Sequence, residues 1–176
     1  MTETIVLGGG CFWCLEAAFK LLRGVESVES GYAAGAVPQP SYAAVCAGTT
    51  GHAEVVRITF DPAQISFAEL LQVFFTLHDP TTLNRQGNDV GTQYRSIIIA
   101  QDAQQAQDAR DFLRWLEAEA VFRQPIVTEL TTVANAPFYP AESYHQNYYA
   151  NHPEQAYCAY VIAPKLAKVK AHLQTK

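Results

Sequence analysis

The chain has 176 residues, enough for one domain with a substantial hydrophobic core, and we expect a single domain over residues 1–176. Hydrophobic residues make up 49% of the sequence and charged residues 16%, a globular composition that excludes a disordered chain. The formal net charge is −5, which argues against nucleic-acid binding, because that function needs a positive surface.

In the N-terminal half, short apolar runs alternate with turn signals. Residues 5–7 form an apolar run that indicates a buried strand. A helix is expected from Phe12, with apolar residues at helical spacing through Leu22 and a stop at Gly24. Residues 25–33 and 53–60 are predicted strands, and residues 31–42, with their two prolines, are a predicted loop. The sequence Ser66-x-x-Glu69 is a capping box that predicts a helix to about residue 77.

In the C-terminal half, the polar, glycine-bearing residues 79–93 predict a long loop of the kind that often carries function. A strand is expected over 94–100, a helix over 102–122 and a further strand over 126–133. An aromatic-rich loop with a short helix follows at 137–149, and then a C-terminal segment runs through Cys158. The order strand, helix, strand, strand, helix, strand predicts an α+β protein. We expect a ferredoxin-like α/β sandwich, a mixed sheet with packed helices and long terminal and loop extensions.

The sequence predicts neither a membrane span nor a secretory signal. No apolar run approaches the ~20 residues that cross a bilayer. The stretch MTETIVLGGG lacks a basic region followed by a long apolar one. Four cysteines are too few for a disulfide scaffold, so we expect a cytoplasmic protein with reduced thiols.

The stretch GGGCFWCLE places Cys11 at the expected start of a helix. A cysteine is a nucleophile only as the thiolate, and a helix N-terminus lowers the thiol pKa. The glycines allow a tight turn that would aim the free N–H groups of the first helical turn at the sulfur. We therefore predict that Cys11 is functional, the alternative being a buried structural cysteine.

Cys14 lies one helical turn after Cys11, on the same side of the helix. Such a pair can form a disulfide, supply two metal ligands or have no joint role. A structural zinc site would need two further ligands at a second tight spacing, and Cys46, His52 and Cys158 do not provide one. The C-x-x-C spacing also occurs in thioredoxin-like dithiol sites.

Phe12 and Trp13 stand between the two cysteines and suggest a pocket for a small apolar group, such as a methyl on sulfur. Core packing is an equally good explanation of Phe12. Trp13 is harder to explain as core, because a buried indole N–H needs a partner.

Strand alternation over 53–60 places Glu54 on the same face as Val56, Ile58 and Phe60. A carboxyl that is desolvated in this way has a raised pKa and can act as a general acid near neutral pH. If the strand end frays, Glu54 instead reaches water.

Several other polar residues are weak signals when taken singly. They are Tyr42, Tyr94, Asp89, His52, His78 and His145. A cysteine hydrolase would need one of these histidines beside Cys11, which the sequence cannot show.

Taken together, the motifs resemble the methionine sulfoxide reductase A family over about residues 4–170. The combination of GCFW, GHAE and QGNDVGTQYRS is very specific. The stretches that carry the resemblance are GCFWCLE, GYAAG, PSY, GTTGHAEVVRITFDP, HDPTTLNRQGNDVGTQYRS and PFYPAESYHQNYY.

The resemblance implies a reductase of methionine S-sulfoxide, free or in proteins, without a metal or organic cofactor. We expect a monomer, although the sequence itself carries no signal for oligomeric state. Cys11 would attack the sulfoxide sulfur while Glu54 protonates the oxygen, leaving a sulfenic acid on Cys11. A second thiol would convert it to a disulfide that thioredoxin reduces. The remaining positions carried over are Phe12 and Trp13 for the methyl pocket, Tyr42 and Tyr94 for the sulfoxide oxygen, Asp89 in support and His145 near the pocket.

The resemblance leaves the resolving thiol open. Many relatives have glycine at the position of Cys14 and resolve with a cysteine at the position of Cys158, whereas others carry GCFWC. Proximity to Cys11 favours Cys14. A mobile terminal segment favours Cys158, which we prefer, with Cys14 as a direct or intermediate partner. Cys46 is predicted to be a small packing residue without a role.

Two other classes of function remain as alternatives. A thiol-based redox sensor would use Cys11 and Cys14 without turnover and would not need Glu54 as an acid. A thioredoxin-like oxidoreductase would reduce protein disulfides and ignore methyl sulfoxides.

Overall fold

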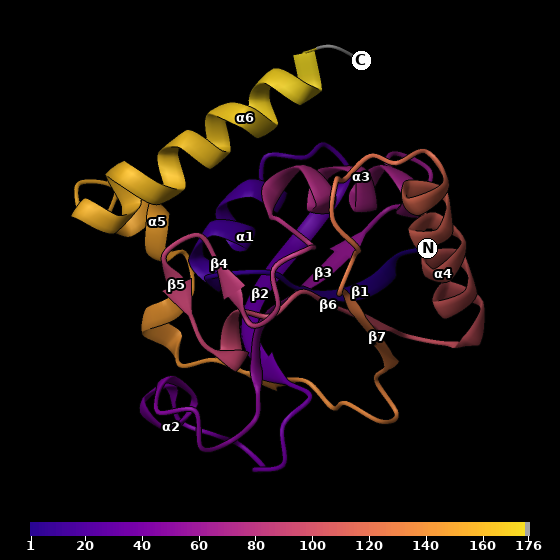
Figure 1. The fold of residues 1–176 in the computed structure, drawn as a ribbon. Helices are drawn as coiled ribbons and strands as arrows, with labels where there is room; N and C mark the ends of the chain where they lie inside the picture. The colour runs from indigo at the N-terminus through magenta and orange to yellow at the C-terminus, as the bar shows by residue number, and fades with distance from the viewer. Residues whose placement is uncertain (175–176) are drawn as a thin grey trace.

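The computed structural model describes residues 1–174, which form a six-stranded sheet, a separate two-stranded hairpin and packed helices (Figure 1). The strands are β1 (Glu3–Gly8), β2 (Val25–Ala33), β3 (Ala53–Phe60), β4 (Arg85–Gln86), β5 (Asp89–Val90), β6 (Ile97–Ala100), β7 (Glu129–Thr132) and β8 (Tyr139–Pro140). The helices are α1 (Phe12–Phe19), α2 (Tyr42–Cys46), α3 (Phe67–Leu77), α4 (Ala103–Ala118), α5 (Tyr148–Asn151) and α6 (Ala163–Gln174). Single 3₁₀ turns cover Thr92–Tyr94 and Ser143–His145, and a π-helical turn, Cys158–Ile162, leads directly into α6.

The predicted α+β fold is confirmed, and its core has the split βαβ order. Along the chain, β1, α1, β2, β3, α3 and β6 follow one another. In the sheet these strands lie in the order β6-β1-β3-β2, each antiparallel to its neighbour, as in ferredoxin-like folds. The sheet is mixed because β7 adds to β6 in parallel after α4, while β8 extends the other edge antiparallel to β2.

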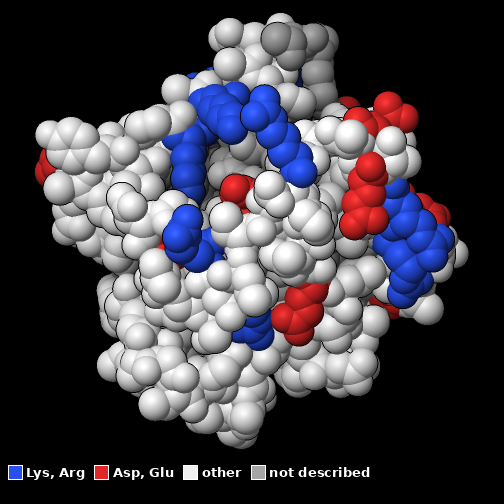
Figure 2. Space-filling model, in the orientation of Figure 1, with Lys and Arg blue, Asp and Glu red and all other residues white. Residues whose placement is uncertain are grey.

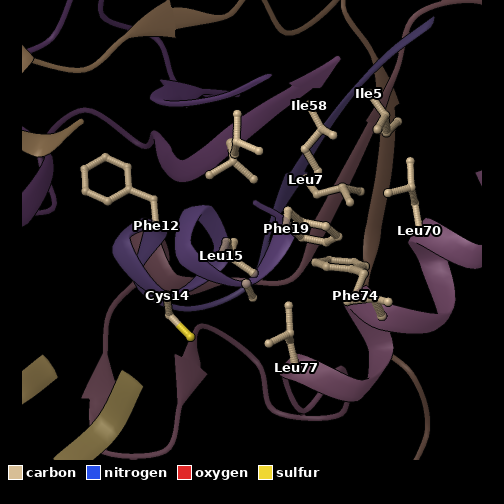
Figure 3. Packing of buried hydrophobic residues seen from close by; sticks show 14 of the residues in the cluster. Ile5, Leu7, Phe12, Cys14, Leu15, Phe19, Ile58, Leu70, Phe74 and Leu77 are labelled. Atoms are coloured by element: carbon tan, nitrogen blue, oxygen red, sulfur yellow. The ribbon is translucent and has the colours of Figure 1, made fainter. Parts of the chain in front are cut away.

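The main hydrophobic core lies between one face of the sheet and the helices α1, α3, α4 and α6. Figure 3 shows Leu15 and Phe19 of α1 facing Phe74 and Leu77 of α3. Removing apolar area from water at roughly 25 cal/mol per Å² is the main source of stability in such a layer. The other face of the sheet has a smaller buried cluster, covered by residues 133–138. The first residues of α1 are therefore fixed by packing on the sheet.

The predicted elements with the strongest local signals have the bounds that we expected. β2 and β3 coincide with the predicted strands. The capping box is present: Ser66 Oγ accepts from the Glu69 N–H (3.1 Å), and the Glu69 carboxylate accepts from the Ser66 N–H (2.8 Å). Regular alternation and reciprocal capping are thus sufficient to set these boundaries.

Other predicted elements are present but shorter. α4 ends at Ala118 and not at Phe122, because Ala120 adopts a left-handed φ of 49° that a right-handed helix cannot contain. The strand expected from Tyr94 begins at Ile97, because Tyr94 lies in a 3₁₀ turn.

Two predictions about cysteines are wrong. Cys46 lies on α2, a helix that was not predicted, and its side chain is exposed and not packed. Cys158 is not in a mobile tail: it is 0% exposed, in the π-helical turn whose residues join the main core. In Figure 1, α6 follows this turn and crosses above α1, with which it is in contact.

None of the helices within residues 1–174 is long and apolar enough to cross a membrane.

Candidate functional site

The glycine run after β1 lies against the turn that holds Tyr94 and against the end of α3. Gly10 has a left-handed φ of 88°, and its N–H donates to the Tyr94 carbonyl oxygen (3.1 Å). A Cβ on Gly9 would lie 2.8 Å from the ring of His78, so only glycine fits this approach to the end of α3. The chain therefore reaches Cys11 through a turn that also fixes the Tyr94 loop beside it.

Cys11 is the N-cap residue of α1, as predicted, and is 8% exposed. The expected low pKa is wrong for the resting protein. Burial raises the pKa of the Cys11 thiol well above its ordinary value, and the charge of Glu54 raises it further. The Trp13 backbone N–H and the Tyr157 hydroxyl lower this pKa, but they do not offset burial. Cys11 is therefore a neutral thiol in the resting protein.

Glu54 lies directly under the start of α1, because its Oε1 accepts a hydrogen bond from the Phe12 backbone N–H (3.1 Å). Its side chain is 1% exposed, on the face of β3 that carries Val56 and Ile58 into the main core. Burial raises the pKa of Glu54 to about 8, against the lowering effect of the Phe12 N–H. The predicted buried acid is confirmed in its location and in the direction of its pKa shift.

Phe12 and Trp13 build different parts of the site. Phe12 is 0% exposed, and its ring lies against Tyr32, Tyr42 and His145, with centroid distances of 5.6, 6.4 and 5.0 Å. Phe12 therefore packs in the core, which confirms the core-packing interpretation, and its role in a pocket for a methyl group stays a prediction.

Trp13 is partly exposed and is held on two sides. Its Nε1–H donates to His145 Nδ1 (3.0 Å), the partner that a buried indole N–H needs. Its ring stacks on Tyr148 at a centroid distance of 3.7 Å, and Tyr157 meets it edge-on at 6.0 Å. Trp13 thus offers a fixed apolar surface beside Cys11.

Tyr42 and Tyr94 reach the same site from α2 and from the 3₁₀ turn before β6. Burial raises the pKa of both phenols above the ordinary value, and the charges of Glu54 and Cys11 contribute to both shifts. Both hydroxyls therefore stay protonated and can donate hydrogen bonds near Cys11.

Asp89 joins the site through Tyr157, whose hydroxyl donates to Asp89 Oδ2 (2.6 Å). The charge of Asp89 also contributes to the raised pKa of Glu54, Cys14 and Tyr94. Asp89 is therefore linked to the Trp13 ring through Tyr157.

Sequence reasoning missed Glu142, which binds both Tyr32 and Tyr42. Glu142 Oε1 accepts from the Tyr32 hydroxyl (2.8 Å) and Oε2 from the Tyr42 backbone N–H (2.9 Å). The only sequence signal was its place in the stretch PAESYHQ, three residues before His145. Tyr32, Tyr148 and Tyr157 were missed as well, because single tyrosines carry little sequence signal.

All four cysteines are free thiols, and Cys14 and Cys158 are both buried. Burial raises the pKa of Cys14 to about 11, with Lys165 lowering it and Asp89 raising it. Burial also raises the pKa of Cys158. Neither side chain is reactive without a change in its surroundings.

A cavity of about 780 Å³ lies on one side of the site, between the end of α3, the β4–β5 hairpin and α6. Arg123, Lys165 and Lys168 contribute to its rim, and Figure 2 shows blue side chains around this hollow close to α6. Cys11 and Glu54 do not line it, whereas Asp89 does. Within residues 1–174, no group of three or more His, Cys, Asp or Glu side chains is arranged to hold a metal ion.

Comparison with known proteins gives a consistent result. The family model for peptide methionine sulfoxide reductase matches residues 3–176. The chain is 59% identical to peptide methionine sulfoxide reductase MsrA of Chromobacterium violaceum over 169 residues, covering 96% of this chain and 94% of the relative. Against MsrA of Ralstonia nicotianae it is 56% identical over 170 residues, covering 96% and 89% of the two chains.

Solved structures with the same fold include methionine sulfoxide reductase A of Corynebacterium diphtheriae, with a TM-score of 0.79 and 40% identity over 88% of this chain and 76% of that one. Reduced Mxr1 of Saccharomyces cerevisiae has a TM-score of 0.81 and 33% identity over 89% of each chain. Mxr1 has also been solved in complex with Trx2; that structure is 21% identical to this chain with a TM-score of 0.56, covers 84% of each, and shows likeness of fold alone.

Proposed function

Because the chain belongs to the peptide methionine sulfoxide reductase family and reduces methionine sulfoxide, we propose that Cys11 is its nucleophile and Glu54 its general acid. One observation carries this assignment. The Glu54 carboxyl accepts the N–H of the residue that follows Cys11, and its pKa is raised to about 8. A carboxyl that is still protonated near neutral pH thus lies beside a thiol at a helix start.

The first step transfers the sulfoxide oxygen to the enzyme. The Cys11 sulfur attacks the sulfoxide sulfur while Glu54 donates its proton to the sulfoxide oxygen. The protonated oxygen passes to the Cys11 sulfur as the sulfur–oxygen bond of the substrate and the transient bond between the two sulfurs break. Methionine leaves, Cys11 is oxidised to a sulfenic acid, and Glu54 regains the proton that the Cys11 thiol gave up. A protonated Glu54 carries no negative charge, so it does not oppose formation of the Cys11 thiolate. The same group thus favours both formation of the nucleophile and protonation of the sulfoxide oxygen.

The remaining residues bind and orient the substrate. The Tyr42 and Tyr94 hydroxyls donate to the sulfoxide oxygen, and their raised pKa values keep them protonated. The partly exposed ring of Trp13, with Phe12 beside it, takes the methyl group. With oxygen and methyl fixed on different sides of the sulfur, the third substituent points outward for the S epimer only.

This function is tested by a single-turnover reaction without reductant, using separate S and R epimers and counting free thiols. We expect about one methionine per chain from the S epimer only, with two thiols lost, as one sulfenic acid condenses with one thiol. Methionine formation with loss of a single thiol would support the reductase function and contradict the resolving step. No methionine from either epimer would overturn the proposal.

We propose that Cys14, and not Cys158, first attacks the Cys11 sulfenic acid. Cys14 lies one helical turn from Cys11, and its N–H donates to the Cys11 carbonyl oxygen (3.2 Å), so the two residues are close in space. Cys158 is 0% exposed in the π-helical turn before α6, so it can take over the disulfide only after this segment opens. Because both thiols are buried, the proposal rests on the proximity of Cys14 to Cys11 and departs from the preference for Cys158 drawn from the sequence.

Mass spectrometry after one turnover distinguishes the two thiols. We expect Cys158→Ser to retain a Cys11–Cys14 disulfide, because its first resolving thiol is intact, and Cys14→Ser to accumulate Cys11 sulfenic acid over the first seconds. A Cys11 disulfide that disappears in Cys158→Ser and persists in Cys14→Ser contradicts this order and restores Cys158 as the direct partner.

The disulfide is reduced by an external dithiol protein, and we propose a thioredoxin in this role. The existence of an Mxr1 complex with Trx2 supports this choice. A dithiol donor attacks one sulfur of the disulfide, releases the other as a thiol and closes its own disulfide, so that two electrons enter per cycle.

A further inference from the structure

Glu16 is a buried acid in the stretch GCFWCLE that the reaction does not use. It lies on α1, one turn after Trp13, and its side chain is 2% exposed. Buried carboxylates are rare unless they are paired, so its partners indicate what it holds.

The backbone partners of Glu16 belong to residues 145–148, the segment whose His145 and Tyr148 contact Trp13. Glu16 Oε1 accepts the backbone N–H of Asn147 (2.7 Å), and the Tyr148 N–H also interacts with the carboxylate. The other oxygen, Oε2, faces Lys20 Nζ at 3.7 Å, and Lys20 Nζ in turn donates to Asn147 Oδ1. Asn147 is thus bound by Glu16 through its backbone N–H and by Lys20 through its side chain.

Asn147 stands between the two residues that fix Trp13. His145 accepts the indole N–H, and Tyr148 stacks on the indole ring. Asn147 itself has a left-handed φ of 58°, a conformation that asparagine adopts more readily than most residues other than glycine. The carboxylate at the start of α5 maintains it by accepting the N–H groups that this short helix leaves free.

We propose that Glu16 is a positioning residue that holds His145 and Tyr148 against Trp13 and so shapes the substrate pocket. This inference rests on the proposed role of Trp13 as the surface that receives the substrate. Glu16 does not touch the reacting atoms. Its loss should weaken binding of the sulfoxide in the ground state and the transition state alike, which raises KM more than it lowers kcat.

The test compares Glu16→Ala, Glu16→Gln and the control Glu117→Ala, an exposed glutamate on α4, for reduction of a methionine S-sulfoxide with dithiothreitol as reductant. We expect Glu16→Ala to raise KM about tenfold with kcat changed less than about threefold. Glu16→Gln keeps an acceptor oxygen for the Asn147 N–H, so we expect it to rescue most of the loss. Glu117→Ala should leave both constants unchanged.

A spectroscopic readout reports the position of Trp13 directly. The chain has two tryptophans, and Trp115 is half exposed on α4, so Trp115→Phe leaves Trp13 as the sole emitter. In this background, Glu16→Ala should shift the emission to longer wavelength as the indole loses Tyr148 and becomes solvated. Unchanged emission together with unchanged KM would overturn the proposal. If Glu16→Ala does not fold, Glu16→Asp, whose shorter side chain cannot reach Asn147, takes its place in both measurements.

Combination with Tyr148→Ala separates this inference from the proposed function. If Glu16 acts through Tyr148, the two losses do not add, and Glu16→Ala has little further effect once Tyr148 is truncated. If Tyr148→Ala raises KM while Glu16→Ala does not, only the role of Glu16 fails. If truncating Tyr148 or Trp13 leaves KM unchanged, the proposed pocket fails, and the role of Glu16 fails with it.

Discussion

Replacing Cys11 by serine should abolish methionine sulfoxide reduction, lowering kcat/KM by about four orders of magnitude or more, as loss of a catalytic nucleophile does in other enzymes. A serine hydroxyl has a much higher pKa than a thiol, and the buried site that already raises the pKa of the Cys11 thiol would raise it further. Serine also cannot form a sulfenic acid. The assay is the initial rate with the S epimer and dithiothreitol, which bypasses any protein reductant.

Thermal unfolding supplies the control for this variant. Serine is close to cysteine in size, and Cys11 makes no cap hydrogen bond that holds α1, so the melting temperature should stay within a few degrees of the wild type. Residual turnover above about 1% of the wild-type rate in a folded variant would show that another thiol can act as nucleophile.

Glu54→Gln should lower the rate of the first methionine formed by a factor of about 10² to 10⁴, the usual contribution of a general acid. In the wild type, the rate should fall as the pH rises through about 8, because Glu54 then loses the proton that it donates. The variant should lack this alkaline limb. Rapid-quench measurement of methionine between about pH 6 and 10 checks both effects.

The same substitution should make the protein more stable in alkali. Glu54 has a pKa of about 8 in the folded chain and an ordinary, lower value when unfolded. Between these two values the folded state binds a proton that the unfolded state does not, so stability falls as the pH rises. Above a pH of about 8, Glu54→Gln should raise the free energy of unfolding by up to roughly 5 kcal/mol, and below about pH 4 it should have little effect.

Glu26→Gln on β2 is a matched control, because Glu26 is an exposed glutamate on the neighbouring strand. It should change neither the pH profile nor the pH dependence of unfolding in urea. An alkaline limb that survives in Glu54→Gln would assign it to another group, and the role of Glu54 as the acid would fail.

Local signals in the sequence set much of the fold. β3 was predicted from its alternation, and α3 from reciprocal capping by Ser66 and Glu69, both of which act within a few residues. α2 was missed because its five residues fall between glycine- and proline-bearing segments, where composition favours a loop. Segments as short as this are stabilised by tertiary contacts more than by propensity.

The burial of Cys158 had a sequence signal that was not used. Cys158, Ile162, Leu166 and Val169 recur at helical spacing and are all buried, which is the pattern of a packed helix. By contrast, the pKa of Cys11 could not be read from the sequence, because the depth of burial of the site depends on segments far along the chain.

The partners of the site residues also lie beyond the reach of sequence patterns. Glu54 was found because its own strand reveals its face. Glu142 contacts Tyr32 and Tyr42 across 110 and 100 residues, and no periodicity reports such a contact. The sequence therefore placed Cys11, Glu54, Asp89 and His145 in the candidate site and missed Glu142, Tyr32, Tyr148 and Tyr157.

The hydrogen bond between the Trp13 indole and His145 joins residues 132 positions apart, so its two partners are synthesised at different times. A ribosome releases Cys11 and Trp13 well before the segment with His145 and Tyr148. Until that segment has emerged, the nascent chain carries the thiol without the residues that hold Trp13 beside it. The competence to bind substrate is thus acquired only after residues 145–148 have been translated, and not progressively as the chain lengthens.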